Sequence, residues 1–145
     1  MKRIALFTGS FNPFTIGHRS VVERALPLFD EIVIAVGINP DKKPACIADV
    51  VEAITKVWSH EPRVRVVTFS GLAVDAAKEL GAQFLLRGVR NAQDFEYEKN
   101  MANINRRLSG IETVLLPTLP ELEHVSSSLV RELQRFGKDA SDLMA

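Results

Sequence analysis

Short apolar runs alternate along the chain with longer segments of helical periodicity, and this alternation constrains the fold more than any other feature. The apolar runs predict strands at residues 3–8, 31–37, 63–69, 83–87 and 112–116. The remaining segments predict helices at residues 17–29, 48–59, 72–80, 92–108 and 126–136. The predicted strands are apolar or β-branched on both faces, which is typical of parallel strands covered by helices on both sides.

This order of elements predicts an α/β fold: a Rossmann-like single domain with a five-stranded parallel sheet and helices on both faces. The 145 residues suit one compact domain, and no internal repeat, low-complexity tract or linker divides them. We therefore expect one domain over residues 1–145. Pro27 should distort the last turn of the first helix, and residues 39–44 should form a polar loop.

The charges balance, with 18 Lys and Arg residues against 18 Asp and Glu residues. Nucleic-acid-binding domains usually carry a basic excess, so we expect no nucleic-acid partner. No apolar run reaches the roughly 18 residues of a membrane span, and the basic start at Met1 does not lead into a signal peptide. The single cysteine, Cys46, cannot form an internal disulfide. A cytoplasmic protein without a membrane partner is the expectation.

The turn after the first strand, G-S-F-N-P-F-T-I-G-H at residues 9–18, is the first candidate site. Ligands of parallel sheets bind beyond the carboxyl ends of the strands. Glycines let the backbone approach an anion, and a helix start offers free N–H groups to phosphate. A tight turn with a surface histidine is the alternative, but His18 directly after Gly17 favours the phosphate site. Neither a P-loop nor a G-x-G-x-x-G motif occurs.

Further anion-binding groups follow the other strands. Lys42, Arg87 and Arg90 lie at or near predicted strand ends, and three serines open the last helix at residues 126–128. A triphosphate and a second phosphate repel each other, so their reaction needs a cationic cleft. Taken singly, each charge could be a solvated surface residue and one serine an ordinary N-cap. Asp94 and Glu98 share a helix face, for which a solvated acidic face is the alternative.

Several motifs together resemble a known family along almost the whole chain. Residues 9–18 are similar to the T/H-x-G-H signature of the nucleotidylyltransferases. Lys42-Lys43-Pro44, R-G-V-R at 87–90, D-F-E-Y-E at 94–98, the segment from Met101 to Arg106 and S-S-S-L-V-R-E at 126–132 follow in order. Together these segments resemble phosphopantetheine adenylyltransferases.

The resemblance implies transfer of the adenylyl group of ATP to 4′-phosphopantetheine. The products would be dephospho-coenzyme A and pyrophosphate, in the penultimate step of coenzyme A biosynthesis. The acceptor phosphate would attack the α-phosphorus directly and in line, without a covalent intermediate. Mg²⁺ would be the cofactor without a dedicated protein metal site, the assembly would be a homohexamer, and coenzyme A is a candidate feedback ligand.

The resemblance also implies roles for individual residues. The catalytic residues would be His18, Lys42 and Ser10. The phosphopantetheine site would comprise Ser10, Lys42, Val74, Arg87 and Asn105, although core packing is an equal alternative for Val74 and its neighbours Leu72 and Ala73. The ATP site would comprise Gly9, Ser10, Phe11, Gly17, His18, Gly88, Arg90, Glu98, Ser126, Ser127 and Ser128, with Glu98 near the ribose.

Three departures from the family pattern leave alternatives open. Asn12 replaces a usual Asp, and F-N-P is more typical of nicotinate mononucleotide adenylyltransferases. Residues 47–51 lack the usual acid pair and arginine, and Leu122 replaces an aromatic residue found in some members. The alternatives are a sister transferase for nicotinate mononucleotide or glycerol phosphate, and a non-catalytic nucleotide-binding regulator. The R-G-V-R and D-F-E-Y-E segments favour phosphopantetheine, and His18 with Lys42 favours catalysis.

Overall fold

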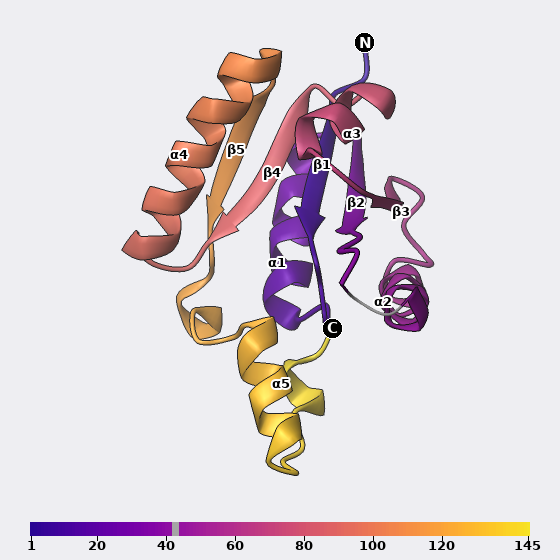
Figure 1. The fold of residues 1–145 in the computed structure, drawn as a ribbon, viewed down its shortest axis with the longest axis vertical. Coiled ribbons are helices and arrows are strands. Elements are labelled where there is room, and N and C mark those ends of the chain that lie inside the picture. The colour runs from indigo at the N-terminus through magenta and orange to yellow at the C-terminus, as the bar shows by residue number, and fades with distance from the viewer. Residues whose placement is uncertain (42–43) are drawn as a thin grey trace.

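A five-stranded parallel sheet forms the centre of the computed structural model, which describes residues 1–41 and 44–145. The strand order is β3-β2-β1-β4-β5, and every pair of neighbours is parallel (Figure 1). The strands are β1 (Ile4–Gly9), β2 (Glu31–Gly37), β3 (Val64–Phe69), β4 (Phe84–Val89) and β5 (Glu112–Pro117). The predicted sheet is therefore confirmed.

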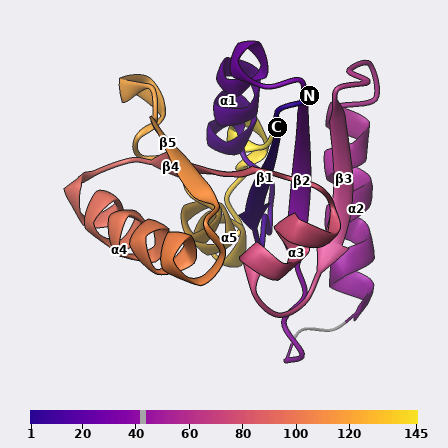
Figure 2. The ribbon, with the colours of Figure 1, turned by 90° about the horizontal axis from the view of Figure 1, so that it is seen from above.

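Helices cover both faces of this sheet. The covering helices are α1 (Ile16–Ala25), α2 (Pro44–Val57), α3 (Ala73–Glu79) and α4 (Ala92–Ser109), whereas α5 (Ser127–Arg135) lies beyond the carboxyl ends of the strands. Figure 2 shows α1 on one side of the sheet and α3 and α4 on the other. Successive residues of β1 point to opposite faces: Phe7 packs with residues of α1 and α2, and Leu6 packs with residues of α3.

Two predicted helix boundaries differ from the structure by more than two residues. The first helix ends at Ala25 and continues as a 3₁₀ turn over Leu26–Leu28, because Pro27 lacks an N–H and cannot continue an α-helix. The second helix begins at Pro44 and not near residue 48, so the predicted polar loop to residue 44 was too long. Proline suits a first helical turn, where its missing N–H would have no partner.

Strand β4 also runs two residues further than predicted. Gly88 and Val89 pair with β5, opposite Leu116 and Pro117. Arg87 is therefore inside the strand, and it faces the same side of the sheet as Leu85 because residues two apart share a face. This register aims the guanidinium at α4.

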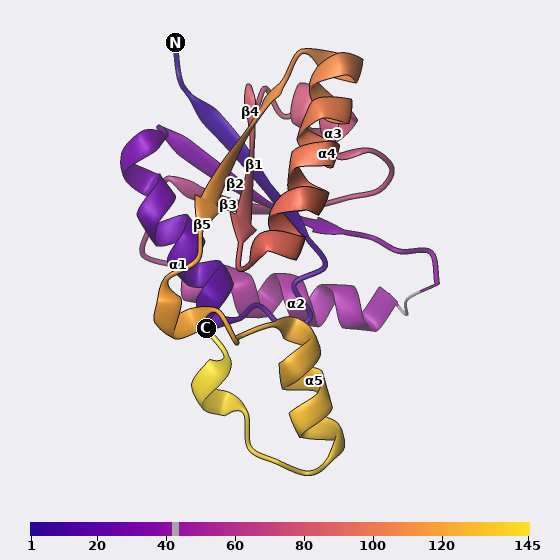
Figure 3. The same ribbon diagram turned by 90° about the vertical axis from the view of Figure 1, so that its left-hand side faces the viewer.

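The last part of the chain lies beyond the carboxyl ends of the strands. Figure 3 shows α5 below the sheet, with the following residues returning to the start of α1. This places the start of α5 opposite the turn after β1, where the sequence predicted a ligand. Among the residues that the structure describes, no helix is long and apolar enough to cross a membrane.

Candidate active site

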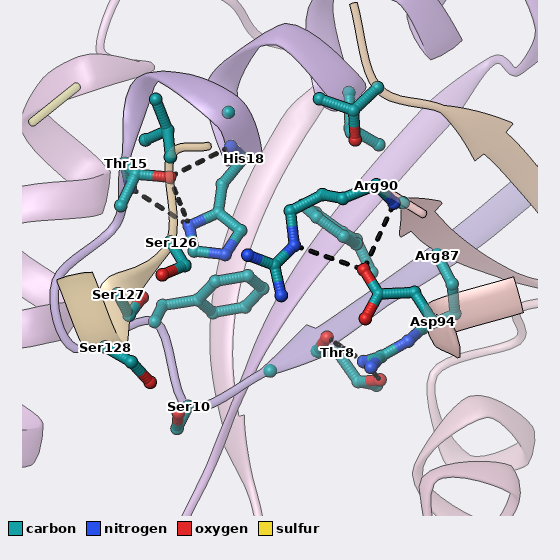
Figure 4. A pocket seen from close by; sticks show the side chains of 18 of the residues that line it. Thr8, Ser10, Thr15, His18, Arg87, Arg90, Asp94, Ser126, Ser127 and Ser128 are labelled. Carbon is teal, nitrogen blue, oxygen red and sulfur yellow. Dashed lines mark hydrogen bonds and ion pairs between the residues drawn. The ribbon is translucent and has the colours of Figure 1, made fainter. Parts of the chain in front are cut away.

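A cavity of about 380 Å³ opens at the carboxyl ends of β1 and β4, between the starts of α1 and α5 (Figure 4). The residues predicted to bind ATP all line it: Gly9, Ser10, Phe11, Gly17, His18, Gly88, Arg90, Glu98, Ser126, Ser127 and Ser128. Arg87 lines it too. The fold thus brings four separate sequence segments to one cleft, and His18 shares that cleft with both arginines.

Two glycines are required by close packing around this cavity. A Cβ on Gly9 would meet the Phe11 ring at 2.9 Å, and a Cβ on Gly88 would meet Cγ2 of Val21 at the same distance. Real Cβ atoms essentially never come that close. Gly9 therefore lets the buried Phe11 ring fold back under the turn, and Gly88 lets α1 lie against β4.

The imidazole of His18 is fixed by the residue that caps α1. The Thr15 N–H donates to Nδ1 of His18 at 3.0 Å, and Oγ1 of Thr15 accepts from the His18 N–H at 3.3 Å. Thr15 is 1% exposed, so this capping box is shielded from water. Because Nδ1 accepts a hydrogen bond, the neutral ring carries its proton on Nε2.

The surroundings of His18 keep the ring neutral. Burial, together with the positive charges of Arg87 and Arg90, lowers the pKa of His18 to about 4. The ring stacks on Phe14 with centroids 5.5 Å apart and meets the edge of Phe11 at 5.0 Å. At pH 7 the ring is therefore a hydrogen-bond donor through Nε2 and carries no charge.

Arg90 directly follows the carboxyl end of β4 and is held there by the first turn of α4. Its backbone N–H and its Nε both donate to Asp94 at 3.1 Å. Asn91 caps this helix by accepting from the Asp94 N–H at 2.8 Å. The terminal nitrogens of Arg90 make no hydrogen bond to the described side chains or backbone, so they can donate to an anion.

Arg87 makes a denser set of bonds. Nε and Nη2 donate to the Glu98 carboxylate at 2.8–3.0 Å, and Nη1 donates to the Thr8 carbonyl at 2.6 Å. Glu98 is 6% exposed, so the alternative of a solvated acidic face is wrong for this residue. The predicted contact of Glu98 with a ribose stays a prediction. In the structure the Glu98 carboxylate accepts its hydrogen bonds from Arg87.

The three serines before and in α5 have different partners. Oγ of Ser126 accepts from the Leu129 N–H at 3.1 Å and is the N-cap. Oγ of Ser127 donates to the Pro13 carbonyl at 2.7 Å, and Oγ of Ser128 accepts from Arg131 at 3.2 Å. Ser127 and Ser128 place the first turn of α5 in the cavity lining, and the first N–H groups of a helix have no intrahelical carbonyl partners, as an anion site requires.

Sequence reasoning assigned no role to Arg131, which also lines the cavity. Its position three residues after Ser128 on the predicted helix was the available signal, because residues three apart share a helix face. Arg131 adds a third guanidinium to those of Arg87 and Arg90. Asp94 and Thr118 line the cavity as well.

A second cavity of about 140 Å³ shares Thr8, Arg87, Tyr97 and Glu98 with the first. Asn105 lies in this smaller cavity, together with Ala73, Met101 and Ala102. Val74 does not line either cavity: its side chain is 2% exposed and packs in the core against the sheet. The structure thus favours the core alternative for Val74, and Ala73 is the groove residue of that segment.

The remaining sequence predictions fall elsewhere. Lys42 lies outside the described residues. Leu122 lies in a 3₁₀ turn over Pro120–Leu122 and does not line either cavity. The Asn12 carbonyl accepts a hydrogen bond from Nη1 of Arg131 at 2.6 Å. Asn12, which replaces the usual Asp of the family, therefore makes this contact through its backbone and not through its side chain.

Comparison with known proteins first defines the class. A model of the cytidylyltransferase-like family matches residues 6–133. A solved structure from Vibrio parahaemolyticus, assigned as a nicotinate-nucleotide adenylyltransferase, superposes with a TM-score of 0.68 at 20% identity. That superposition covers 100% of this chain and 94% of the other, and it shows a shared fold. The fold and the site are those of a nucleotidyltransferase.

Curated relatives narrow the class further. The phosphopantetheine adenylyltransferase of Porphyromonas gingivalis is 50% identical over 99% of this chain and 94% of its own length. Those of Bacteroides fragilis and Cytophaga hutchinsonii are 51% and 43% identical, over 96% and 99% of this chain and 93% and 97% of their own lengths. The chain belongs to the phosphopantetheine adenylyltransferase family.

Proposed function

We propose that this enzyme transfers the adenylyl group of ATP to 4′-phosphopantetheine and releases dephospho-coenzyme A and pyrophosphate. The observation that carries the proposal is the pair of adjoining cavities, which share Arg87 and Glu98. The larger cavity has the donors that a triphosphate needs, and the smaller one extends along α4 to Asn105. The names of the relatives support this choice of substrates.

The larger cavity suits the nucleotide. The β- and γ-phosphates would lie at the start of α5, where backbone N–H groups, the Ser128 hydroxyl, Arg90 and Arg131 converge. Gly9 and Gly88 line the cavity, and glycines let a phosphate approach the backbone closely, so the α-phosphate would lie beside them. The acceptor phosphate would enter beside Ser10, and its pantetheine arm would lie along the smaller cavity with Asn105. Lys42 keeps its proposed role at the acceptor phosphate.

The chemical step needs no general base. An oxygen of the acceptor phosphate, already ionised near pH 7, attacks the α-phosphorus and forms the new O–P bond. The bond from that phosphorus to the β-phosphate oxygen breaks, and pyrophosphate leaves with the electron pair. Catalysis then rests on positioning and on charge stabilisation. His18 donates from Nε2 to the oxygens of the crowded phosphorus, where charge accumulates in the transition state.

Mg²⁺ is proposed to accompany the triphosphate. Within the described ranges, no cluster of three or more His, Cys, Asp or Glu side chains could hold a metal ion. The cavity instead offers isolated oxygens, those of Ser10, Ser128 and Asp94, which fits a magnesium ion that takes most of its ligands from phosphates and water. When bound, the ion would neutralise charge on the departing pyrophosphate.

The homohexamer predicted from the resemblance remains a proposal, and an exposed apolar stripe on α4 supports self-association. Tyr97, Ile104 and Leu108 are 61%, 51% and 59% exposed, and their spacing places them along one side of the helix. Contiguous exposed apolar side chains of this kind mark interfaces. Coenzyme A is a second proposed ligand. It contains the pantetheine arm, so it would compete with the substrates for both cavities. The cytoplasmic location stays a prediction.

An acceptor panel tests the substrate. The enzyme is incubated with ATP and Mg²⁺ and with phosphopantetheine, nicotinate mononucleotide or glycerol phosphate in turn, and pyrophosphate release is measured. We expect release with phosphopantetheine alone. Release with another acceptor instead would show a sister transferase, and ATP binding without release from any acceptor would show a regulator.

A further inference from the structure

Three consecutive carbonyls in the turn after β1 accept hydrogen bonds from the last part of the chain. Nη1 of Arg131 donates to the Asn12 carbonyl at 2.6 Å, and Oγ of Ser127 donates to the Pro13 carbonyl at 2.7 Å. The Ala145 N–H donates to the Phe14 carbonyl at 3.1 Å. The turn is therefore held along its length by residues more than a hundred positions away.

The segment at residues 140–145 makes the contact nearest to the imidazole. Met144 forms an antiparallel bridge with Thr15, directly beside the bond from Ala145 to Phe14. The segment is itself anchored, because Ala140 is 2% exposed and Ala145 packs against the main core. Figures 1 and 3 show these last residues beside the start of α1.

Phe14 and Thr15, the two residues of the turn that pair with this segment, also hold His18. Thr15 donates its N–H to Nδ1 of His18 at 3.0 Å, and the Phe14 ring stacks on the imidazole. Met144 and Ala145, in contrast, line neither cavity. Phe14 and Thr15 therefore give residues 140–145 a direct connection to His18 although the segment itself does not reach the cavities.

We propose that residues 140–145 are a positioning segment for His18: the backbone bond from Ala145 to Phe14 and the bridge between Met144 and Thr15 fix the Thr15 N–H, and this N–H fixes the imidazole with Nε2 toward the phosphates. Catalysis by a positioned donor is sensitive to displacement, and a shift of about 1 Å can cost about 100-fold in rate. The kinetic part of this inference rests on the proposed function, whereas the placement of the ring does not.

The test removes one donor. Ala145→Pro deletes the N–H that bonds to Phe14, and Met144, at φ −90° and ψ 143°, already has the extended backbone that precedes proline. Ala145→Ser is the matched control, because it keeps the N–H. A chain that stops at Met144 removes the same donor without the proline ring, and it serves if Ala145→Pro does not fold.

The first readout is the titration of His18 in the ligand-free protein, followed by NMR of its ring. The resonance is assigned with a His18→Asn variant, since the chain has three histidines. Charged groups around the same cavity are Arg87, Arg90, Asp94, Glu98 and Arg131, and both variants leave them unchanged. We expect the pKa of His18 to rise from about 4 toward 6.5 in Ala145→Pro, because a loosened ring gains water, and to stay low in Ala145→Ser.

The second readout is steady-state kinetics. We expect kcat of Ala145→Pro to fall about tenfold or more while KM for ATP changes little, since the nucleotide contacts are intact. A purely structural segment would lower the melting temperature and leave both the titration and kcat unchanged, and that result would overturn the inference. If the titration moves but wild type forms no dephospho-coenzyme A, the proposed function fails and the positioning of the ring stands.

Discussion

His18 shows at the scale of one residue how a titratable ring becomes a fixed neutral donor. Thr15 occupies Nδ1, aromatic rings exclude water, and two arginines disfavour a proton on the ring. A protonated imidazole would bring more charge, but it would also surrender the bond that orients it. The site therefore fixes the orientation of the imidazole at the expense of its charge. The arginines supply the positive potential.

Replacing His18 should therefore affect turnover more than binding. We expect His18→Asn to lower kcat by about 100- to 1,000-fold, the usual loss when one transition-state donor is removed, with the dissociation constant for ATP nearly unchanged. Rapid-quench kinetics and calorimetric titration with ATP measure the two quantities. His60→Asn, at an exposed position, is the control. Turnover of His18→Asn close to that of wild type would remove the assigned role.

The pKa of the same ring predicts a pH dependence of stability. In the unfolded chain His18 binds a proton near pH 6.5, and in the folded chain only near pH 4. Between these values the unfolded state holds more protons, so the free energy of unfolding falls as the pH falls from 6.5 to 4, by about 3 kcal/mol from this group. Urea unfolding at several pH values measures the slope. His18→Asn should flatten it, and an unchanged slope would contradict the burial of the ring.

At the scale of elements, the ion pair between Arg87 and Glu98 connects β4 to α4 and lines both cavities. Glu98 is buried and Arg87 is its cation. Removing one partner of a buried pair leaves an uncompensated charge, which is far worse than replacing both partners by apolar side chains.

The pair can be tested by a double-mutant cycle. We expect Arg87→Met to lower the free energy of unfolding by about 3–5 kcal/mol, and the double variant Arg87→Met with Glu98→Met to recover much of that loss. Urea denaturation measures each variant. Arg106→Met, which breaks the exposed pair with Glu112, should cost less than about 1 kcal/mol. Additive losses in the cycle would show that the two side chains do not interact.

Elements also show where sequence reasoning reached its limit. The strands could be predicted because their apolar residues face helices on both sides. The end of β4 could not, because a glycine after Arg87 is typical of a turn, whereas Gly88 and Val89 continue the strand and pair with β5. The early start of α2 was missed because P-A-C-I at residues 44–47 has no polar cap, so the helix was predicted only from residue 48.

At the scale of the whole molecule, the residues of the larger cavity were predictable because parallel strands end at one edge of the sheet. Every residue predicted for ATP lies there. The contacts of residues 140–145 with Phe14 and Thr15 were not predictable, because they join distant segments through backbone groups that every residue type carries. Val74 was misassigned for the related reason that an apolar residue suits a core and a groove equally.

The central claim is that two repelling phosphates meet in one cleft and that an oxygen of the acceptor phosphate attacks the α-phosphorus of ATP. The most direct measurement uses phosphopantetheine whose terminal phosphate oxygens are labelled with ¹⁸O, together with unlabelled ATP, and mass spectrometry of both products. Direct attack on the α-phosphorus predicts that dephospho-coenzyme A keeps every labelled oxygen and that pyrophosphate contains none. Label in pyrophosphate, or no dephospho-coenzyme A at all, would contradict the account.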